Sequence, residues 1–186
     1  MTAEILKTIP CSGEFPEKHF GTHFNSRLWV KFTDNDFQDW VGCFSKPYQI
    51  FDTVLTDSKN ETAFVVAGGK GYLVDITNRE LIYEIAEIPT IESAISTTNP
   101  DYFLVGACYT FYVMNKQGLV KTIDPDFITD GIYLIEQNKN VAVGHLFSGM
   151  YSDTNIGFEL DLQTFELKLN EEIKYRYVEP FKFIKI

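Results

Sequence analysis

An internal repeat with a period near 39 residues constrains the fold of this chain more than any other feature. Phe64 corresponds to Phe103 at this spacing, Val66 corresponds to Val105, and a third apolar run begins at Val141. Each run follows a polar turn rich in Asn, Asp or Lys, which are residues that favour chain reversal. Self-similarity at this period is typical of chains that stack one small structural unit several times.

Each repeat contains several short apolar runs rather than one long one. The first repeat has such runs at 63–68, 72–76 and 81–85, with Val, Ile, Phe and Tyr prominent and with alternation at their edges. This pattern predicts β-strands, and helical periodicity is nearly absent. We therefore expect an all-β fold of repeated four-stranded antiparallel meanders. The expected repeats are 50–90, 91–131 and 132–170.

These units resemble the blades of a β-propeller, which are small four-stranded sheets repeated every 40–50 residues or so. The resemblance covers about 50–170 of the sequence. It is generic, because the Gly-His and Trp-Asp dipeptides of WD repeats and the paired glycines of kelch blades do not occur at matching positions. It implies a single domain over 1–186 with a small, propeller-like fold of about four blades.

The two ends of the chain decide whether such a propeller closes. Residues 1–26 are expected to be irregular, and 27–49 contain only half a blade. Alternating runs in 171–186 predict two closing strands, with Pro180 bending or breaking them. If these strands complete the first sheet, the propeller closes, and if they do not, the chain is an open array whose edges need covering.

The charge of the chain points to one class of partner. It has 26 Asp and Glu against 16 Lys and Arg, giving a formal net charge of -10. This excess argues against nucleic acid or an anionic membrane as the main partner and favours a basic protein. No apolar run is long enough for a signal peptide or a transmembrane helix, so we expect a cytoplasmic protein. Three widely spaced cysteines are expected to be reduced thiols.

Two motifs that could bind a ligand have simpler interpretations. The glycines of 67–71 lie between two predicted strands, and Tyr72 stands where a phosphate loop needs Ser or Thr, so a hairpin turn explains them. Cys11, His19 and His23 could meet at a metal ion, but structural zinc sites usually have a second pair of ligands. We therefore expect neither a metal nor another cofactor.

A nucleophilic triad could be composed from Cys43 or Cys108 with His145 and a carboxylate. Only composition supports it, and a free Cys after an apolar strand is usually buried in the core. We therefore predict no catalytic residue.

Acidic residues are concentrated in the middle of the sequence. The stretch from Asp75 to Asp101 contains a single cation, Arg79, and more carboxylates follow around Pro125. They could be a solvated surface that prevents sheets from pairing edge to edge, or a face that attracts a basic protein. An apolar pair, Met150 and Tyr151, lies on the expected inserted loop 147–155 and could anchor a partner. The predicted partner-binding residues are Asp75, Glu80, Glu84, Glu87, Asp124, Asp126, Asp130 and Tyr151.

The sequence thus favours a non-catalytic protein-binding module. In size, charge and lack of catalytic motifs the chain is similar to bacterial immunity proteins, which neutralise basic nuclease toxins. In such a role the carboxylates would imitate phosphate charge and cover the partner's cationic site. The alternatives are a small-ligand binder or enzyme with its site at the propeller hub, and a subunit of a larger assembly.

Overall fold

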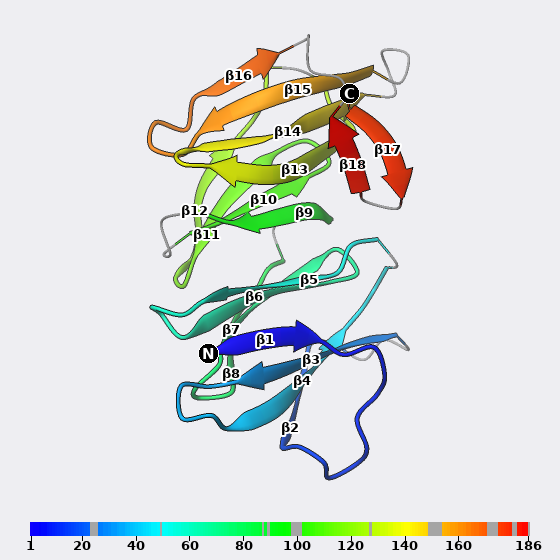
Figure 1. Ribbon diagram of the computed structural model, residues 1–186, viewed down its shortest axis with the longest axis vertical. Helices are drawn as coiled ribbons and strands as arrows, with labels where there is room; N and C mark the ends of the chain where they lie inside the picture. Colours follow the sequence, from blue (N-terminus) through cyan, green and yellow to red (C-terminus); the bar gives the residue numbers. More distant parts are fainter. Residues whose placement is uncertain are drawn as a thin grey trace. The chain divides into compact units, whose positions relative to one another are not determined.

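A computed structural model covers residues 1–186 and describes all of them except 23–25, 49, 87, 89, 98–101, 127, 149–153, 171–174, 180–181 and 186. For 154, 175–179 and 182–185 it describes the backbone. The described residues form β-strands and contain no α-helix (Figure 1), and thus no helix long and apolar enough to cross a membrane. The chain divides into two compact units, which we call unit 1 (Met1–Ile91 with Asn115–Gly118) and unit 2 (Glu92–Met114 with Leu119–Ile186).

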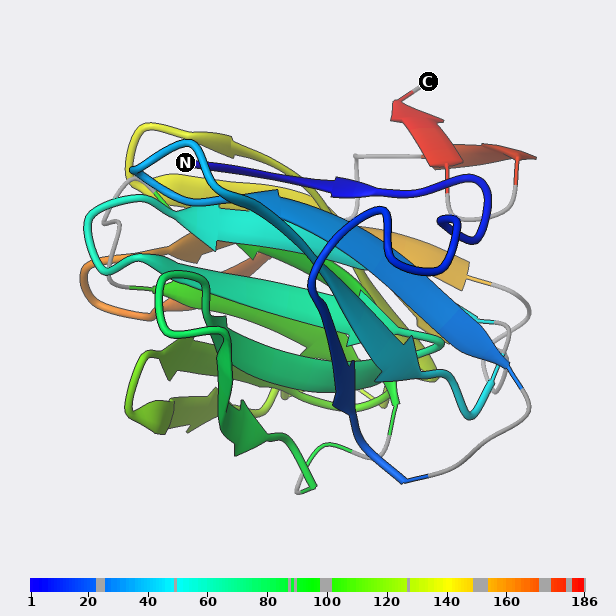
Figure 2. The same cartoon turned by 90° about the horizontal axis from the view of Figure 1, so that it is seen from below.

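The first sheet of unit 1 contains β1 (Thr2–Ile5), β2 (Glu17–Phe20), β3 (Arg27–Thr33) and β4 (Asp39–Ser45) in the order β1-β3-β4-β2. β2 runs parallel to β4, whereas the other two pairs are antiparallel. The β3–β4 hairpin thus has a strand from the N-terminal segment on each edge (Figure 2).

The expectation of an irregular segment over 1–26 is therefore wrong for β1 and β2. Each of these strands has only four residues, and most of their side chains are exposed or half-buried. Edge strands of this length carry too few apolar residues to show a period of two in the sequence. The hairpin's unpaired backbone groups supply the hydrogen bonds that hold these strands.

The second sheet of unit 1 lies within the repeat predicted at 50–90. It contains β5 (Thr53–Asp57), β6 (Thr62–Ala67), β7 (Lys70–Asp75) and β8 (Glu80–Glu84) as an antiparallel meander. The turn between β6 and β7 is made by Gly68 and Gly69, whose φ angles are 59° and 82°. A Cβ atom on Gly68 would lie 2.0 Å from the Tyr48 carbonyl oxygen, so a larger residue does not fit this turn.

Unit 2 contains two further four-stranded sheets. One has the order β12-β11-β10-β9 and the other the order β13-β14-β15-β16. Their strands fall within the repeats predicted at 91–131 and 132–170. The bounds are β9 (Ile91–Ser96), β10 (Phe103–Ala107), β11 (Phe111–Asn115), β12 (Gly118–Ile123), β13 (Gly131–Asn138), β14 (Val141–Ser148), β15 (Thr154–Asp161) and β16 (Leu167–Asn170).

Two features near the C-terminus differ from the sequence expectation. The loop expected at 147–155 is shorter, because β14 and β15 continue to pair as far as Ser148 and Thr154. The last two strands, β17 (Tyr175–Glu179) and β18 (Lys182–Lys185), pair with each other. The first sheet obtains its two edge strands from β1 and β2 instead.

Aromatic side chains fill the core between the two sheets of unit 1. Phe32 stacks on Trp40 with ring centroids 4.4 Å apart, and Phe20 stacks on Phe44 at 5.0 Å. The Trp40 Nε1–H donates a hydrogen bond of 2.9 Å to the carbonyl oxygen of Ile76, just beyond β7. The core cluster contains residues of both sheets, so the sheets pack face to face.

The core of unit 2 is mainly aliphatic. Leu104 and Val113 from one sheet pack with Leu146 of the other, and Phe111 meets Phe158 edge to face at 4.9 Å. Each unit thus buries one face-to-face pair of four-stranded sheets. The expected all-β, propeller-like fold with four four-stranded sheets is confirmed.

A side-chain turn recurs at the end of the third strand in three of the four sheets. The side chains of Asp75, Asn115 and Asp161 accept hydrogen bonds of 2.7 to 2.9 Å from backbone N–H groups two or three residues further on. Such turns direct the chain into the fourth strand. Part of the chain's acidity therefore has a local structural role.

Candidate functional site

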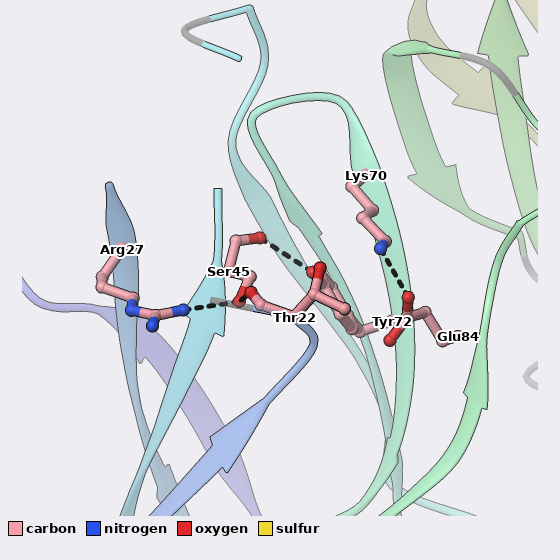
Figure 3. Close-up of polar contacts among 6 residues, drawn as sticks. All are labelled: Thr22, Arg27, Ser45, Lys70, Tyr72 and Glu84. Carbon is pink, nitrogen blue, oxygen red and sulfur yellow. Dashed lines mark hydrogen bonds and ion pairs between the residues drawn. The ribbon is translucent and has the colours of Figure 1, made fainter. Parts of the chain in front are cut away.

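The predicted acidic residues of unit 1 lie on and beside β8. Asp75 accepts hydrogen bonds from the backbone and side-chain nitrogens of Asn78, at 2.7 and 2.9 Å. Glu84 forms an ion pair with Lys70, with 2.5 Å between Oε1 and Nζ (Figure 3). Glu80 is exposed. The charge of Glu84 is therefore offset by Lys70 within the unit, whereas Asp75 is held by neutral donors.

A polar network beside Lys70 connects the two sheets of unit 1 (Figure 3). The Tyr72 hydroxyl donates a hydrogen bond of 2.8 Å to the Ser45 carbonyl oxygen, which joins β7 to β4. Arg27 donates to the Ser45 hydroxyl at 2.5 Å, and that hydroxyl donates to the Thr22 carbonyl oxygen. Burial, and then the nearby Glu84, raise the pKa of Tyr72, so this residue remains a neutral donor. The network holds the sheets together and contains no activated nucleophile.

The predicted acidic residues of unit 2 lie together in the loop between β12 and β13. Asp124, Asp126 and Asp130 are all exposed. The Thr110 hydroxyl donates a hydrogen bond of 2.8 Å to Asp124 Oδ1, which fixes the β10–β11 turn beside this loop. No cation lies between Asp124 and Asp130 in the sequence. This loop thus carries the densest exposed negative charge among the predicted residues.

Two large apolar side chains are exposed on the same elements. Tyr109, in the β10–β11 turn, is 63% exposed, and Ile128, in the β12–β13 loop, is 52% exposed. We call Tyr109, Asp124, Asp126, Ile128 and Asp130 the acidic loop surface. An aromatic residue within a polar, charged rim is typical of protein interfaces.

Tyr109 was not predicted as a site residue, although it stands in the short gap between the apolar runs at 102–107 and 110–114. The Ala107 N–H bonds to the Thr110 carbonyl oxygen at 3.2 Å, so Cys108 and Tyr109 occupy the two turn positions of a hairpin. A large side chain at such a position has no sheet face to pack on.

Two of the predicted partner-binding residues, Glu87 and Tyr151, lie outside the residues that the structure describes.

A half-buried carboxyl and thiol lie next to the acidic loop surface. Cys108 Sγ donates to Glu92 Oε1 at 3.4 Å. Burial raises the pKa of Glu92, and the negative charge of Asp130 adds to the shift. Burial, followed by the charge of Glu92, raises the pKa of Cys108 to about 11. The thiol therefore stays protonated near neutral pH, which is the opposite of an activated cysteine nucleophile.

The other residues considered for catalysis are also neutral. His145 is fully buried and stacks on Tyr133 with centroids 4.9 Å apart, and burial lowers its pKa to about 4. Cys43 is buried, and burial raises the pKa of its thiol. A buried neutral imidazole and buried thiols are typical of core positions.

The residues considered for a metal site lie in the N-terminal segment. Cys11 is exposed, and His19 Nε2 lies 3.7 Å from Glu17 Oε2. Within the described part of the chain, no group of three or more His, Cys, Asp or Glu side chains could hold a metal ion. His23 lies outside that part.

Comparison with known proteins shows similarity at the level of the fold. Hydrazine synthase from Kuenenia stuttgartiensis matches with a TM-score of 0.53 and 14% sequence identity, over 92% of this chain and 55% of the other. The present chain thus spans about half the length of that relative. The WD40 β-propeller domain of Doa1 matches 76% of this chain and 60% of its own at a TM-score of 0.41 and 12% identity. No protein-family model and no curated protein sequence matches the chain.

Proposed function

We propose that the chain is a non-catalytic protein-binding module that captures a basic partner through the acidic loop surface. The observation that carries this proposal is the position of Tyr109, which is 63% exposed on a turn that Thr110 ties to Asp124. Exposed aromatic side chains supply contact area at low entropic cost, and the surrounding carboxylates attract the partner and orient it.

The net charge of -10 supports the same proposal. Attraction over about one Debye length, roughly 8 Å at physiological salt, raises the rate of encounter with a basic protein. Glu92 is half-buried and accepts a hydrogen bond from the Cys108 thiol, so it is less accessible to a partner than the exposed aspartates. Asp124, Asp126 and Asp130 are therefore the main source of charge at this site, whereas Asp75, Glu80 and Glu84 form a second, weaker patch on unit 1.

A finer form of the proposal names the partner class. In it the chain is an immunity protein, and the partner is a basic nuclease toxin whose cationic nucleic-acid site is covered by the carboxylates. This form is supported by the similarity of the chain to immunity proteins in size and charge, and by the neutral state of Cys43, Cys108 and His145. Protonated thiols and a neutral buried imidazole are not an activated nucleophile and its base, so their state favours binding over catalysis.

The experiment is an affinity capture from the native lysate at about 50 mM and about 500 mM NaCl, a range over which exposed charge attraction is strongly screened. The bait is the wild-type chain, the charge-reversed variant D124K/D126K/D130K, or the single variant Tyr109→Ala. We expect one stoichiometric basic protein with the wild type at low salt, and its loss with the triple variant.

The matched control reverses charge on unit 1 instead, in the variant D75K/E80K/E84K, and should retain most of the capture. A partner retained equally by both triple variants would contradict the acidic loop surface as the site. A captured partner is then assayed for nuclease activity with and without the chain, and an active nuclease in the complex would contradict the immunity form.

A further inference from the structure

One end of the unit 2 core opens into a cavity of about 310 Å³. Two half-buried aromatic residues, Tyr102 and Phe165, line it together with Leu104, Val113 and Leu162. Both sheets of the unit contribute to its wall, so the cavity extends the space between them. A size of this order and a mainly apolar wall are usual for small-molecule sites.

Three uncharged polar side chains complete the lining. Asn140 and Gln163 are exposed and each carries a carboxamide, which can donate and accept hydrogen bonds. The Thr97 hydroxyl donates to the Tyr102 carbonyl oxygen at 3.2 Å. The described lining residues include no Asp, Glu, Lys or Arg.

This lining selects against an ionised ligand. A charge transferred from water into an apolar cavity is strongly penalised unless a counter-charge meets it there. Lys121 places its Nζ 4.7 Å from the centre of the Phe165 ring. A neutral molecule with a flat apolar face and a polar edge matches the two rings and the two carboxamides.

Backbone hydrogen bonds hold the two turns at the mouth of the cavity. The Leu162 N–H donates to the Asn140 carbonyl oxygen at 2.7 Å, and the Phe165 N–H donates to the Asp161 carbonyl oxygen at 2.8 Å. Asp161 also accepts from the N–H groups of Gln163 and Thr164, which lowers the pKa of its carboxyl. Because these bonds fix the turns, the site is formed before a ligand arrives, and little ordering cost remains.

We propose that this cavity is a binding site for a small neutral heteroaromatic ring with a hydrogen-bonding edge, of the nucleobase type. The ring lies against Tyr102 and Phe165, and its edge is recognised by Asn140 and Gln163. The site belongs to unit 2 alone and is separate from the acidic loop surface, so it does not depend on the proposed function.

The test is a titration of the ¹⁵N-labelled full chain with adenine, followed by amide chemical shifts. We expect saturable shifts at Thr97, Leu162 and Phe165. Gln163→Trp places a bulky ring at the mouth from an exposed position and should weaken adenine binding by about tenfold or more. The matched control is Glu166→Trp, the same substitution at an exposed neighbour outside the lining, which should bind adenine as the wild type does.

A second variant tests recognition of the polar edge. Asn140→Ala removes one carboxamide from an exposed turn and should weaken adenine binding about fivefold, as expected for one lost hydrogen bond. It should leave the binding of naphthalene, which has no polar edge, unchanged.

Three results would overturn the proposal. They are shifts that do not saturate, equal affinity in Gln163→Trp and Glu166→Trp, and binding of methyl β-glucopyranoside in place of adenine. The last result would assign the cavity to a sugar instead of a planar ring. An unchanged melting temperature in each variant shows that the mutated chain is still folded.

Discussion

Unit 1 and unit 2 each bury a pair of four-stranded sheets, but they do so with different side chains. In unit 1, Trp40 and Tyr72 pack in the core, and each also donates a hydrogen bond to a backbone carbonyl of the other sheet's chain segment. In unit 2, aliphatic residues meet one aromatic pair, and the core includes the fully buried His145. One end of that core is open. The same arrangement of sheets therefore accommodates two kinds of core. The core of unit 1 is reinforced by side-chain hydrogen bonds, and the core of unit 2 contains a buried histidine and opens into a cavity.

The difference predicts that the units respond differently to perturbation, and the chain offers a simple way to observe this. Both tryptophans, Trp29 and Trp40, belong to unit 1. Tryptophan fluorescence thus reports the unfolding of unit 1, whereas far-UV circular dichroism reports both units.

The largest effect is expected from Trp40→Ala. Removal of a fully buried indole leaves a cavity and an unsatisfied carbonyl at Ile76, and should lower the free energy of unfolding by about 3–5 kcal/mol. Urea denaturation followed by Trp29 fluorescence measures it. The variant Trp40→Phe keeps a ring and loses the hydrogen bond, so its loss should be smaller. Equal loss of amide-exchange protection in unit 2 would show instead that the two units unfold as one.

The next effect concerns pH and unit 2. Burial lowers the pKa of His145 to about 4, below its ordinary value of 6.5, so the unfolded chain binds this proton more readily. The stability that this residue contributes is therefore complete above about pH 6.5 and is lost as the pH falls towards 4, with a total on the order of 3 kcal/mol.

Amide exchange in β14 and β15 at pH 7 and pH 4.5 measures this loss. The variant His145→Phe keeps a ring against Tyr133 and removes the titration, so its unit 2 should lose less stability on acidification. Glu92 acts in the opposite direction, because its raised pKa stabilises the fold at low pH, and it is unchanged in the variant. If the stability of unit 2 falls equally with pH in the wild type and in His145→Phe, His145 is not the cause of the loss.

A smaller effect is expected from the repeated side-chain turns. Asp75→Ala removes the acceptor of two hydrogen bonds from Asn78 and should cost unit 1 about 1–2 kcal/mol, seen as a lower urea midpoint by fluorescence. Glu80→Ala, at an exposed neighbour, should stay within about 0.5 kcal/mol of wild type. Asp161→Ala should lower the stability of unit 2 and leave the fluorescence midpoint unchanged, and a shift of that midpoint would contradict the separation of the units.

The smallest effect is expected at the acidic loop surface. Thr110→Val keeps the shape of the side chain and removes its hydrogen bond to Asp124, at a cost of about 1 kcal/mol or less. Amide exchange at Tyr109 and Asp124 should quicken while the core of unit 2 keeps its protection. Unchanged exchange at both residues would show that this bond does not position the turn.

The strands with long apolar runs could be predicted from the sequence, because their side chains fill the cores. Phe64 and Phe103, which defined the repeat, are both buried. β1 and β2 could not be predicted in this way, because their pairing depends on the edges of a hairpin formed later in the chain. The glycine turn of Gly68 and Gly69 was predictable from local backbone requirements alone.

The site was less predictable than the fold. The ion pair of Glu84 with Lys70 depends on the register of β7 and β8, which shifts at an irregularity between Leu73 and Val74. A sequence does not display such a shift, so Glu84 was expected to be available to a partner. The cavity of unit 2 was also hidden, because its walls come from three turns and strands far apart in the chain.

The position of β1 and β2 on opposite edges of one hairpin has a consequence for the order of folding. In the other three four-stranded sheets, neighbouring strands follow each other along the chain and can pair soon after synthesis. In the first sheet, β1 has no partner until β3 has been made, and β2 has none until β4 has been made, because β2 pairs with Asp39–Ser45. Each edge strand of this sheet thus skips its neighbour in the chain and pairs with the strand after it, so the first sheet is expected to form more slowly than the three meanders.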